Sequence, residues 1–269
     1  MDAVVPPAGD APPREDGPGT RPVHAYAHRG GARHPELVGL ENTMTAFAHA
    51  VALGYRCLET DVHRTRDGVL VAFHDASLDR VTDGVGAIAD LSAAEVAAVR
   101  VAGRERVPLL VELLDAFDDV RINVDLKGEG TAEALADLLA TRPDADRVLV
   151  GSFSPRHLRR FRRLAGDRVA TSAHVAEVAA YRLLPGRLAR VVAPRARALQ
   201  VPVRRGRLRV LTPALLRRAH TAGLEVHVWT VDEADEMERL LDAGVDGLMT
   251  DRTDILGDVL RGRGLWPTT

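Results

Sequence analysis

The sequence predicts an α/β fold, a (β/α)8 TIM barrel with a short insertion after the second barrel strand. Short β-type runs alternate with helical stretches, a pattern typical of parallel sheets. Eight such pairs fit into roughly 240 residues, as a (β/α)8 barrel requires. A doubly wound open sheet is the alternative. It is less favoured because no G-x-G-x-x-G loop follows the first strand.

The composition indicates a globular protein that is not dominated by one sign of charge. The chain has 269 residues, of which 46% are hydrophobic, and a net charge of −2. Nothing in this balance indicates a nucleic-acid partner or an anionic membrane surface. The single cysteine, Cys57, excludes an intrachain disulfide and any metal site built from several cysteines.

Residues 1–22 predict a flexible N-terminal arm, and residues 23–269 predict one barrel domain. The arm is rich in Pro, Gly, Asp and Ala and has no apolar core of a signal peptide. No later stretch reaches the about 18 apolar residues of a membrane span. We therefore expect a cytoplasmic protein without a transmembrane segment.

The first βα unit is predicted from residues 23–28 and 44–53. The strand ends at a pair of glycines, which permit a sharp exit of the chain. Asn42 or Thr43 is the expected N-cap of the helix, and Gly54 follows its end.

The second strand, at residues 56–62, is followed by the insertion, which spans about residues 63–107. Asp67-Gly68 predicts a hairpin with a type I′ turn, leading to a short strand at 69–73. Residues 79–107 are expected to form loops and a small helical segment, because Ser92 and Glu95 have the spacing of a capping box. This segment is short, so we expect an open mouth to the barrel.

Regular alternation follows from Pro108 onward. Strands are expected at 121–126, 148–153, 168–173, 198–201, 224–230 and 246–250. Helices are expected at 109–117, 131–140, 155–164, 175–183, 213–222, 232–243 and 254–260.

Polar side chains end several of these strands, and active sites of barrel enzymes lie at the C-terminal ends of the strands. These residues are His28 on the first strand, Glu59 and Asp61 on the second, Asp125 and Lys127 on the third, and Trp229 on the seventh. We therefore expect a functional site at this rim.

The acidic residues of this rim predict either a cation site or a set of salt bridges. Glu59 and Asp61 are two residues apart, so both point to one face of their strand, and Asn123 shares a face with Asp125. Three neighbouring carboxylates repel one another unless a cation lies between them, and oxygen ligands favour Mg²⁺ or Ca²⁺. In the alternative, Arg29 or Lys127 neutralises the carboxylates.

Two histidines next to this cluster, His28 and His74, predict acid–base chemistry, although either alone is more often a buried structural histidine. Asp75 either orients His74 or caps a turn, and we favour the cap. Phe153 and Trp229 either line the site or belong to the core. The arginines at 156–163 and 187–209 are interpreted as solvated charge, with a lipid surface as the less favoured role.

In the order and spacing of its motifs, the chain resembles the glycerophosphodiester phosphodiesterase family, which is similar to the phosphatidylinositol-type phospholipases C. The matching segments are His28-Arg29-Gly30, Glu41-Asn42-Thr43, Glu59-x-Asp61-Val62, Thr65-x-Asp67-Gly68, His74-Asp75 followed by Leu78-Asp79-Arg80, Val107-Pro108-Leu109 with Glu112-Leu113-Leu114, Asp125-Leu126-Lys127, Val228-Trp229-Thr230-Val231, and Gly244-Val245-Asp246-Gly247 with Thr250-Asp251.

The resemblance implies metal-dependent hydrolysis of a small glycerophosphodiester to sn-glycerol 3-phosphate and an alcohol. It implies a divalent cation on Glu59, Asp61 and Asp125, with His28 and His74 as general acid and base. Arg29 and Lys127 would contact the phosphate. Alternatives are a lysophospholipase D-like activity on longer-chain substrates and a catalytically silent, phosphodiester-binding barrel.

The chain departs from the family pattern at two positions. Asp125 replaces the usual Glu and is one methylene shorter, and Leu40 replaces the usual Pro before Glu41. Glu41 is interpreted either as a residue that supports the site or as part of the helix start. We expect Asn123 to support the site from the third strand.

Overall fold

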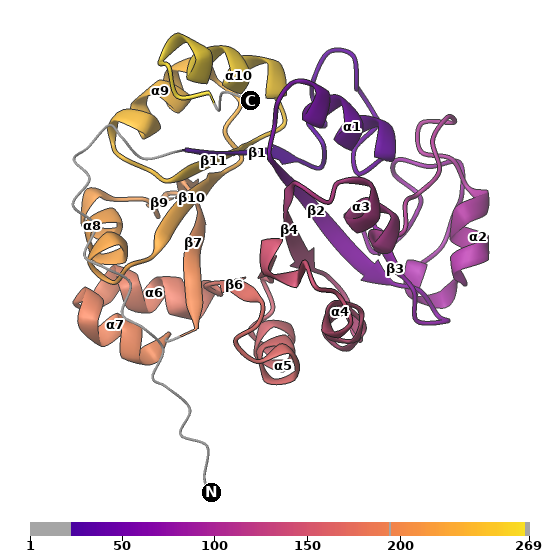
Figure 1. Cartoon of the computed structure of the whole chain (residues 1–269), viewed down its shortest axis with the longest axis horizontal. Helices are drawn as coiled ribbons and strands as arrows, with labels where there is room; N and C mark the ends of the chain where they lie inside the picture. Colours follow the sequence, from indigo (N-terminus) through magenta and orange to yellow (C-terminus); the bar gives the residue numbers. More distant parts are fainter. Residues whose placement is uncertain (1–22, 194, 267–269) are drawn as a thin grey trace, which may run out of the picture.

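The computed structural model describes residues 23–193 and 195–266, so the predicted arm at 1–22 lies outside the described residues. Figure 1 shows a ring of strands surrounded by helices. No helix in the described part of the chain combines the length and the apolar character that crossing a membrane requires.

A closed parallel barrel forms the centre of the molecule, as predicted. Its strands are β1 (His24–His28), β2 (Cys57–Arg64), β4 (Arg121–Leu126), β5 (Val148–Gly151), β6 (Ala170–Ser172), β7 (Ala196–Pro202), β10 (Glu225–Trp229) and β11 (Gly247–Thr250). They follow one another around the ring, and β1 pairs in parallel with both β2 and β11. This double pairing closes the barrel and brings the two ends of the domain together.

Helices cover the outside of the barrel (Figure 1). They are α1 (Met44–Ala52), α3 (Leu110–Ala116), α4 (Thr131–Ala140), α5 (Pro155–Ala165), α6 (Val175–Leu183), α7 (Gly186–Val192), α8 (Pro213–Thr221), α9 (Ala234–Asp242) and α10 (Thr253–Gly262). Thr43 is the N-cap of α1, and its side chain accepts a hydrogen bond from the backbone of Ala46.

The side chains of β2 alternate between the helix-facing core and the barrel interior. Leu58 and Val62 belong to the main core cluster, whereas Cys57 packs with Tyr26 and Met249 in a separate one. Because side chains alternate along a strand, Glu59 and Asp61 share the interior face with Cys57. The side chains of Glu59 and Asp61 therefore point into the barrel near the C-terminal ends of its strands.

The insertion after β2 contains β3 (Leu70–Ala72), a 3₁₀ turn at Ile88–Asp90 and α2 (Ala93–Ala98). β3 runs antiparallel to β2, which confirms the predicted hairpin. The predicted capping box of α2 is also present between Ser92 and Glu95. An apolar cluster of its own holds the insertion together, built from Val71, Phe73, Leu78, Ile88, Val96, Val101 and Val107.

The predicted turn type of the hairpin was wrong. A type I′ turn needs positive φ at both central residues. Gly68 has φ +94°, but Asp67 is not among the described residues with positive φ. The N–H of Gly68 instead donates to the carbonyl of Thr65 at 3.0 Å, and Gly68 leads back into the strand from the left-handed region.

Two short features near β7 were not predicted from the sequence. One is α7, which begins directly after Pro185, and the other is the hairpin of β8 (Arg204–Arg205) and β9 (Leu208–Arg209). Both are shorter than the stretch of sequence over which a hydrophobic periodicity can be recognised.

Candidate active site

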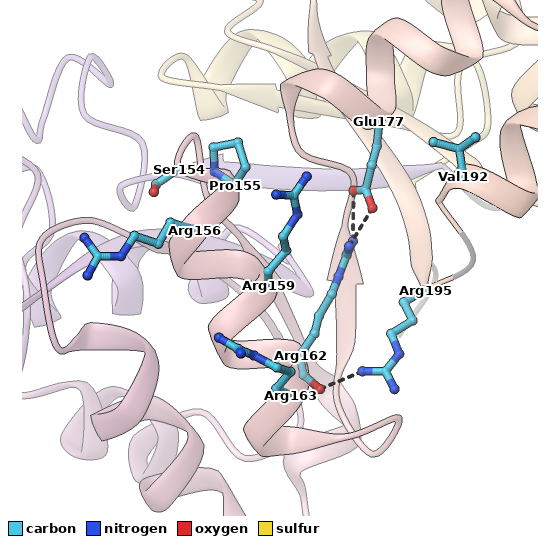
Figure 2. Close-up of a pocket in the computed structure, with 9 residues that line it drawn as sticks. All are labelled: Ser154, Pro155, Arg156, Arg159, Arg162, Arg163, Glu177, Val192 and Arg195. Atoms are coloured by element: carbon cyan, nitrogen blue, oxygen red, sulfur yellow. Dashed lines mark hydrogen bonds and ion pairs between the residues drawn. The ribbon is translucent and has the colours of Figure 1, made fainter.

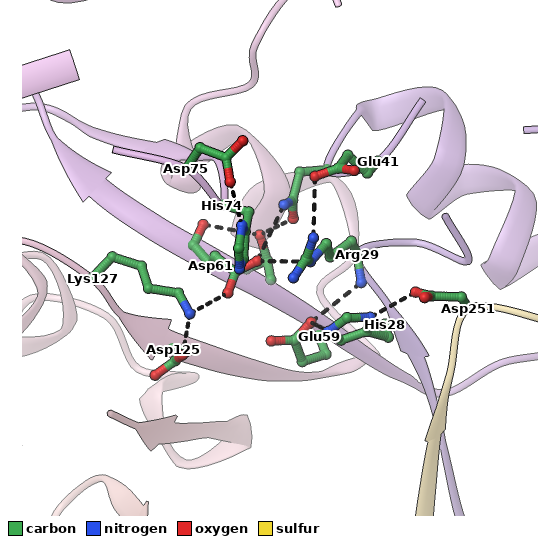
Figure 3. A network of polar contacts seen from close by, with 12 residues as sticks. His28, Arg29, Glu41, Glu59, Asp61, His74, Asp75, Asp125, Lys127 and Asp251 are labelled. Carbon is green, nitrogen blue, oxygen red and sulfur yellow. Dashed lines mark hydrogen bonds and ion pairs between the residues drawn. The ribbon is translucent and has the colours of Figure 1, made fainter. Parts of the chain in front are cut away.

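The carboxylates predicted at the rim come together in the structure (Figure 3). β2 and β4 pair in parallel so that Asp61 lies opposite Asp125, and Glu59 opposite Asn123. Glu59 and Asp61 are buried, at 4% and 2% exposure. The barrel therefore places three acidic groups from two strands in one partly closed space.

Two cations neutralise the centre of this cluster. The Nζ of Lys127 lies 2.9 Å from Asp61 and 2.6 Å from Asp125. The Nε of Arg29 lies 3.1 Å from Asp61, too poorly aligned for a hydrogen bond. Burial opposes the charge of Asp61, but Lys127 and Arg29 lower the pKa of its carboxyl below the usual value. The salt bridges considered as the alternative to a cation are thus present.

Glu59 lies at the less neutralised end of the cluster. It receives the backbone N–H of Arg29 at 3.2 Å and lies 3.8 Å from the Nε2 of His28. Burial and the neighbouring Asp61 raise the pKa of Glu59 to about 7. Burial likewise raises the pKa of Asp125. Asp125 pairs with Lys127, so Glu59 is the carboxylate of the cluster that forms no ion pair with a Lys or Arg side chain among the described residues.

His28, at the end of β1, is held by a residue that sequence reasoning did not select. Its Nδ1 lies 2.6 Å from the carboxylate of Asp251, which follows β11. An ionised carboxylate has no proton to donate, so the imidazole Nδ1–H donates and Nε2 is directed toward Glu59. The sequence held a signal for it, since Asp251 directly follows a predicted barrel strand and belongs to the matching segment Thr250-Asp251.

His74 has a similar arrangement, and our interpretation of Asp75 as a turn cap was wrong. The Nδ1 of His74 lies 2.6 Å from Asp75, whose carboxylate also accepts from Arg80. Burial opposes its charge, but Arg80 and His74 lower the pKa of Asp75. The imidazole is therefore the donor, and its Nε2 is left for another partner.

Arg80 and Glu41 connect the Asp75 carboxylate beside His74 to Arg29 beside His28. Arg80 donates to Glu41 at 2.6 and 2.9 Å, and Glu41 also accepts from Arg29 at 3.2 Å. Thr43, rather than Glu41, caps α1. The structure thus favours a supporting position for Glu41. Arg80 was part of no sequence-based site prediction.

Asn42 is another residue whose role the sequence did not reveal. Its side chain donates to Asp61 at 3.4 Å and accepts from Thr60 at 2.8 Å. Its backbone adopts φ +56°, a left-handed conformation that asparagine tolerates better than most residues. Asn42 therefore fixes the end of the β1–α1 loop against the acidic cluster.

The remaining predicted residues lie at different depths. Asn123 is buried beside Glu59, two residues before Asp125 on β4, and accepts a hydrogen bond from Gln200 at 2.9 Å. Phe153 and Trp229 pack edge to face, with ring centroids 5.5 Å apart. The Nζ of Lys127 lies 5.4 Å from the Phe153 ring centroid, and Phe153 is 56% exposed. Phe153 therefore borders the site and is not a core residue.

The arginines on α5 border a groove of about 820 Å³ on the outer wall of the barrel, shown in Figure 2. The buried Arg162 is neutralised there by Glu177, at 2.6 and 3.1 Å. Arg160, on the same helix, pairs with the exposed Glu133 at 2.7 Å. The basic cluster thus contains both a structural ion pair and solvated charge.

Comparison with known proteins matches this site to one family. The model of the glycerophosphoryl diester phosphodiesterase family covers residues 28–255, from the first proposed catalytic histidine into α10. The chain belongs to this family. It is accordingly a phosphoric diester hydrolase, and the expected substrate class of glycerophosphodiesters is confirmed.

Relatives of similar length support the assignment. A probable glycerophosphodiester phosphodiesterase 2 of Mycobacterium tuberculosis is 42% identical, over 90% of this chain and 92% of the relative. A lysophospholipase D of Rattus norvegicus is 26% identical, over 84% and 82%. The crystal structure of a putative glycerophosphoryl diester phosphodiesterase from Silicibacter pomeroyi has a TM-score of 0.75 and 26% identity, with 92% of this chain and 96% of that chain covered.

Proposed function

We propose that this phosphodiesterase releases sn-glycerol 3-phosphate and an alcohol, with His28 and His74 as its acid–base pair. The observation that carries this proposal is that each imidazole is bonded through Nδ1 to a carboxylate, at 2.6 Å in both cases. Such a bond fixes the tautomer and leaves Nε2 for proton transfer. Both histidines border the same cluster (Figure 3).

We further propose Glu59, Asp61 and Asp125 as the ligands of a divalent cation, Mg²⁺ or Ca²⁺. All three are oxygen donors, and the pKa of Glu59, raised to about 7 by burial and Asp61, indicates that the cluster would gain from further positive charge. A bound cation would stabilise negative charge on the phosphoryl oxygens.

The cationic side chains of the chain are suited to binding the phosphate. Lys127 and Arg29 both pair with Asp61, which holds their cationic ends at the carboxylate cluster. One histidine accepts the proton of the attacking hydroxyl or water as the new P–O bond forms. The other donates a proton to the alcohol oxygen as its P–O bond breaks.

A lysophospholipase D-like activity is the second candidate. The exposed Phe153 ring against Trp229 gives the site an apolar wall, which would suit a longer-chain alcohol. The rat relative carries the same activity in its name. Faster hydrolysis of lysophosphatidylcholine than of glycerophosphocholine would favour this candidate.

The main test compares histidine variants on glycerophosphocholine with Mg²⁺ or Ca²⁺. His28→Ala and His74→Ala should each lower kcat by about 10²-fold or more, since acid–base catalysis contributes about 10²–10⁴-fold. His220→Ala is the matched control, because His220 also pairs with an aspartate, Asp246, at 2.7 Å. His220 lies on α8, which contributes no residue to the carboxylate cluster. Full activity in both site variants, or turnover that is unchanged in EDTA, would refute the mechanism.

The substrate is a small molecule, and we propose that the chain is cytoplasmic, as its sequence led us to expect. Fractionation of the producing cells, with immunodetection of the chain, tests the location. Recovery in the membrane or extracellular fraction would contradict it.

A further inference from the structure

A group of nitrogen and oxygen donors lies outside the carboxylate cluster, where the β1–α1 loop packs against α1. His34 and Glu36 belong to the loop, and His49 lies in the last turn of α1. One potential ligand atom from each residue lies within 4.8 Å of the other two. The catalytic proposal uses none of these three side chains.

The spacing of these donors is close to that of a tetrahedral metal site. The Oε2 of Glu36 lies 3.3 Å from the Nε2 of His49. Two ligands of a tetrahedral ion with bonds of 2.0–2.1 Å are about 3.3 Å apart. The imidazoles of His34 and His49 are neighbours, with ring centroids 4.4 Å apart. Because the Glu36 side chain is 75% exposed, it has room to adjust to an ion.

The nitrogen atoms are also available for coordination. The Nδ1 of His34 accepts the backbone N–H of Glu36 at 3.2 Å, which leaves its Nε2 for a ligand. The Nδ1 of His49 is buried and has no hydrogen-bond partner among the described residues. Apart from the contact of its Nε2 with Glu36, the His49 ring is therefore held by no hydrogen bond among the described residues.

We propose that His34, Glu36 and His49 form a second metal site, for a transition-metal ion of the Zn²⁺ class. Two imidazoles and one carboxylate favour Zn²⁺, Ni²⁺ or Cu²⁺ over Mg²⁺, whereas the carboxylate cluster favours the hard cations. The proposal does not depend on the catalytic roles above.

The position of this site suggests what a bound ion does. The β1–α1 loop begins at Arg29 and ends at Asn42, and both contact Asp61. An ion held by the loop residues and by His49 cross-links the loop to α1. The ion therefore restrains a segment whose two ends carry site residues.

Zn²⁺ binding to the full chain tests the proposal. Calorimetric titration in excess Mg²⁺, added to compete for the carboxylate cluster, should show one Zn²⁺ bound per chain. Both His49→Ala and Glu36→Gln should weaken Zn²⁺ binding by at least about tenfold, since even losing an outer partner of a metal ligand costs about 10–100-fold. Glu36 is exposed, so its variant should fold normally even if another does not.

The matched control is His157→Ala. His157 lies 3.6 Å from Glu129, and its Nδ1 is also buried without a hydrogen-bond partner in the described residues, but it has no second imidazole beside it. This variant should bind Zn²⁺ like the unmodified chain. Equal affinities in the His49, Glu36 and His157 variants, or no Zn²⁺ uptake by the unmodified chain, would overturn the proposal.

Hydrogen exchange gives a readout that is independent of activity. Zn²⁺ should slow amide exchange in residues 31–41 of the unmodified chain and of His157→Ala, and should have no such effect in His49→Ala. Slowed exchange in the His49 variant would mean that Zn²⁺ binds elsewhere, and would contradict the assignment.

Discussion

The Nδ1 of His28 lies 2.6 Å from the carboxylate of Asp251, although 223 residues separate them in the sequence. The contact exists because β1 pairs with β11, with Ala27 opposite Thr250. Closure of the barrel therefore supplies the residue that orients the first histidine.

Replacement of Asp251 by Asn should impair catalysis more than binding. The amide no longer holds His28 in the tautomer that frees Nε2, so we expect kcat to fall by about 10–100-fold, part of the acid–base contribution. KM should change little. Asp258→Asn is the control, since this exposed residue pairs only with Arg261 among the described residues. Steady-state kinetics on glycerophosphocholine measure kcat and KM for the two variants. A normal kcat in Asp251→Asn would exclude the orienting role.

Removal of the divalent cation should abolish activity, and Asp125 should decide how tightly the cation binds. Asp125→Asn removes one negative oxygen ligand, so the Mg²⁺ concentration for half-maximal activity should rise at least about tenfold. Asp125→Glu keeps the charge and restores the residue that the family usually has. We expect it to need less Mg²⁺ than Asp125→Asn. Titration of EDTA-treated enzyme with Mg²⁺ tests this order, and equal requirements in all three proteins would argue against Asp125 as a ligand.

Glu177→Gln should destabilise the fold strongly. Arg162 is buried and donates hydrogen bonds to both carboxylate oxygens of Glu177, so the variant leaves a buried guanidinium without its counter-charge. Breaking such a pair costs about 3–5 kcal/mol of unfolding free energy. Glu133→Gln on α4 breaks the exposed pair with Arg160, which lies on α5 like Arg162. This change should cost less than about 1 kcal/mol of unfolding free energy. Urea unfolding compares them, and similar losses would show that burial does not matter here.

The free energy of unfolding should depend on His24 at alkaline pH. Cys57 and Glu225 raise the pKa of His24 to about 9, while burial opposes this, and the rings of Tyr26 and His227 border it. A raised pKa in the folded state stabilises the fold fully below the unfolded pKa of about 6.5 and loses this contribution as the pH rises through 9.

His24→Gln removes this titration and provides the comparison. The unfolding free energy of the unmodified chain should fall relative to that of His24→Gln by about 3 kcal/mol between pH 6 and pH 10. Urea unfolding at each pH measures the difference. A constant difference over this range would show that His24 has no raised pKa.

The sequence alone predicted the barrel, which the structure confirms, and the strands on which the proposed site residues lie. Strand and helix patterns are local, because they depend on side-chain periodicity, glycine and capping residues within a few positions. Glu59 and Asp61 are two apart on one strand, so their common direction is also a local property. His28, His74, Arg29 and Lys127 lie at that rim in the structure, and their roles there stay predictions.

Only the tertiary structure decided which partners hold these groups. Asp251 reaches His28 through barrel closure, and Arg80 reaches Glu41 across 39 residues. Asp75 bonds to a side chain rather than to a turn, and His49 meets the loop residues His34 and Glu36 only when α1 packs under that loop. These contacts are long-range or depend on side-chain rotamers. The periodicity of residues along a helix or strand therefore does not predict them. The sequence fixes residue types and their order along each strand, whereas the closed barrel determines which of them meet.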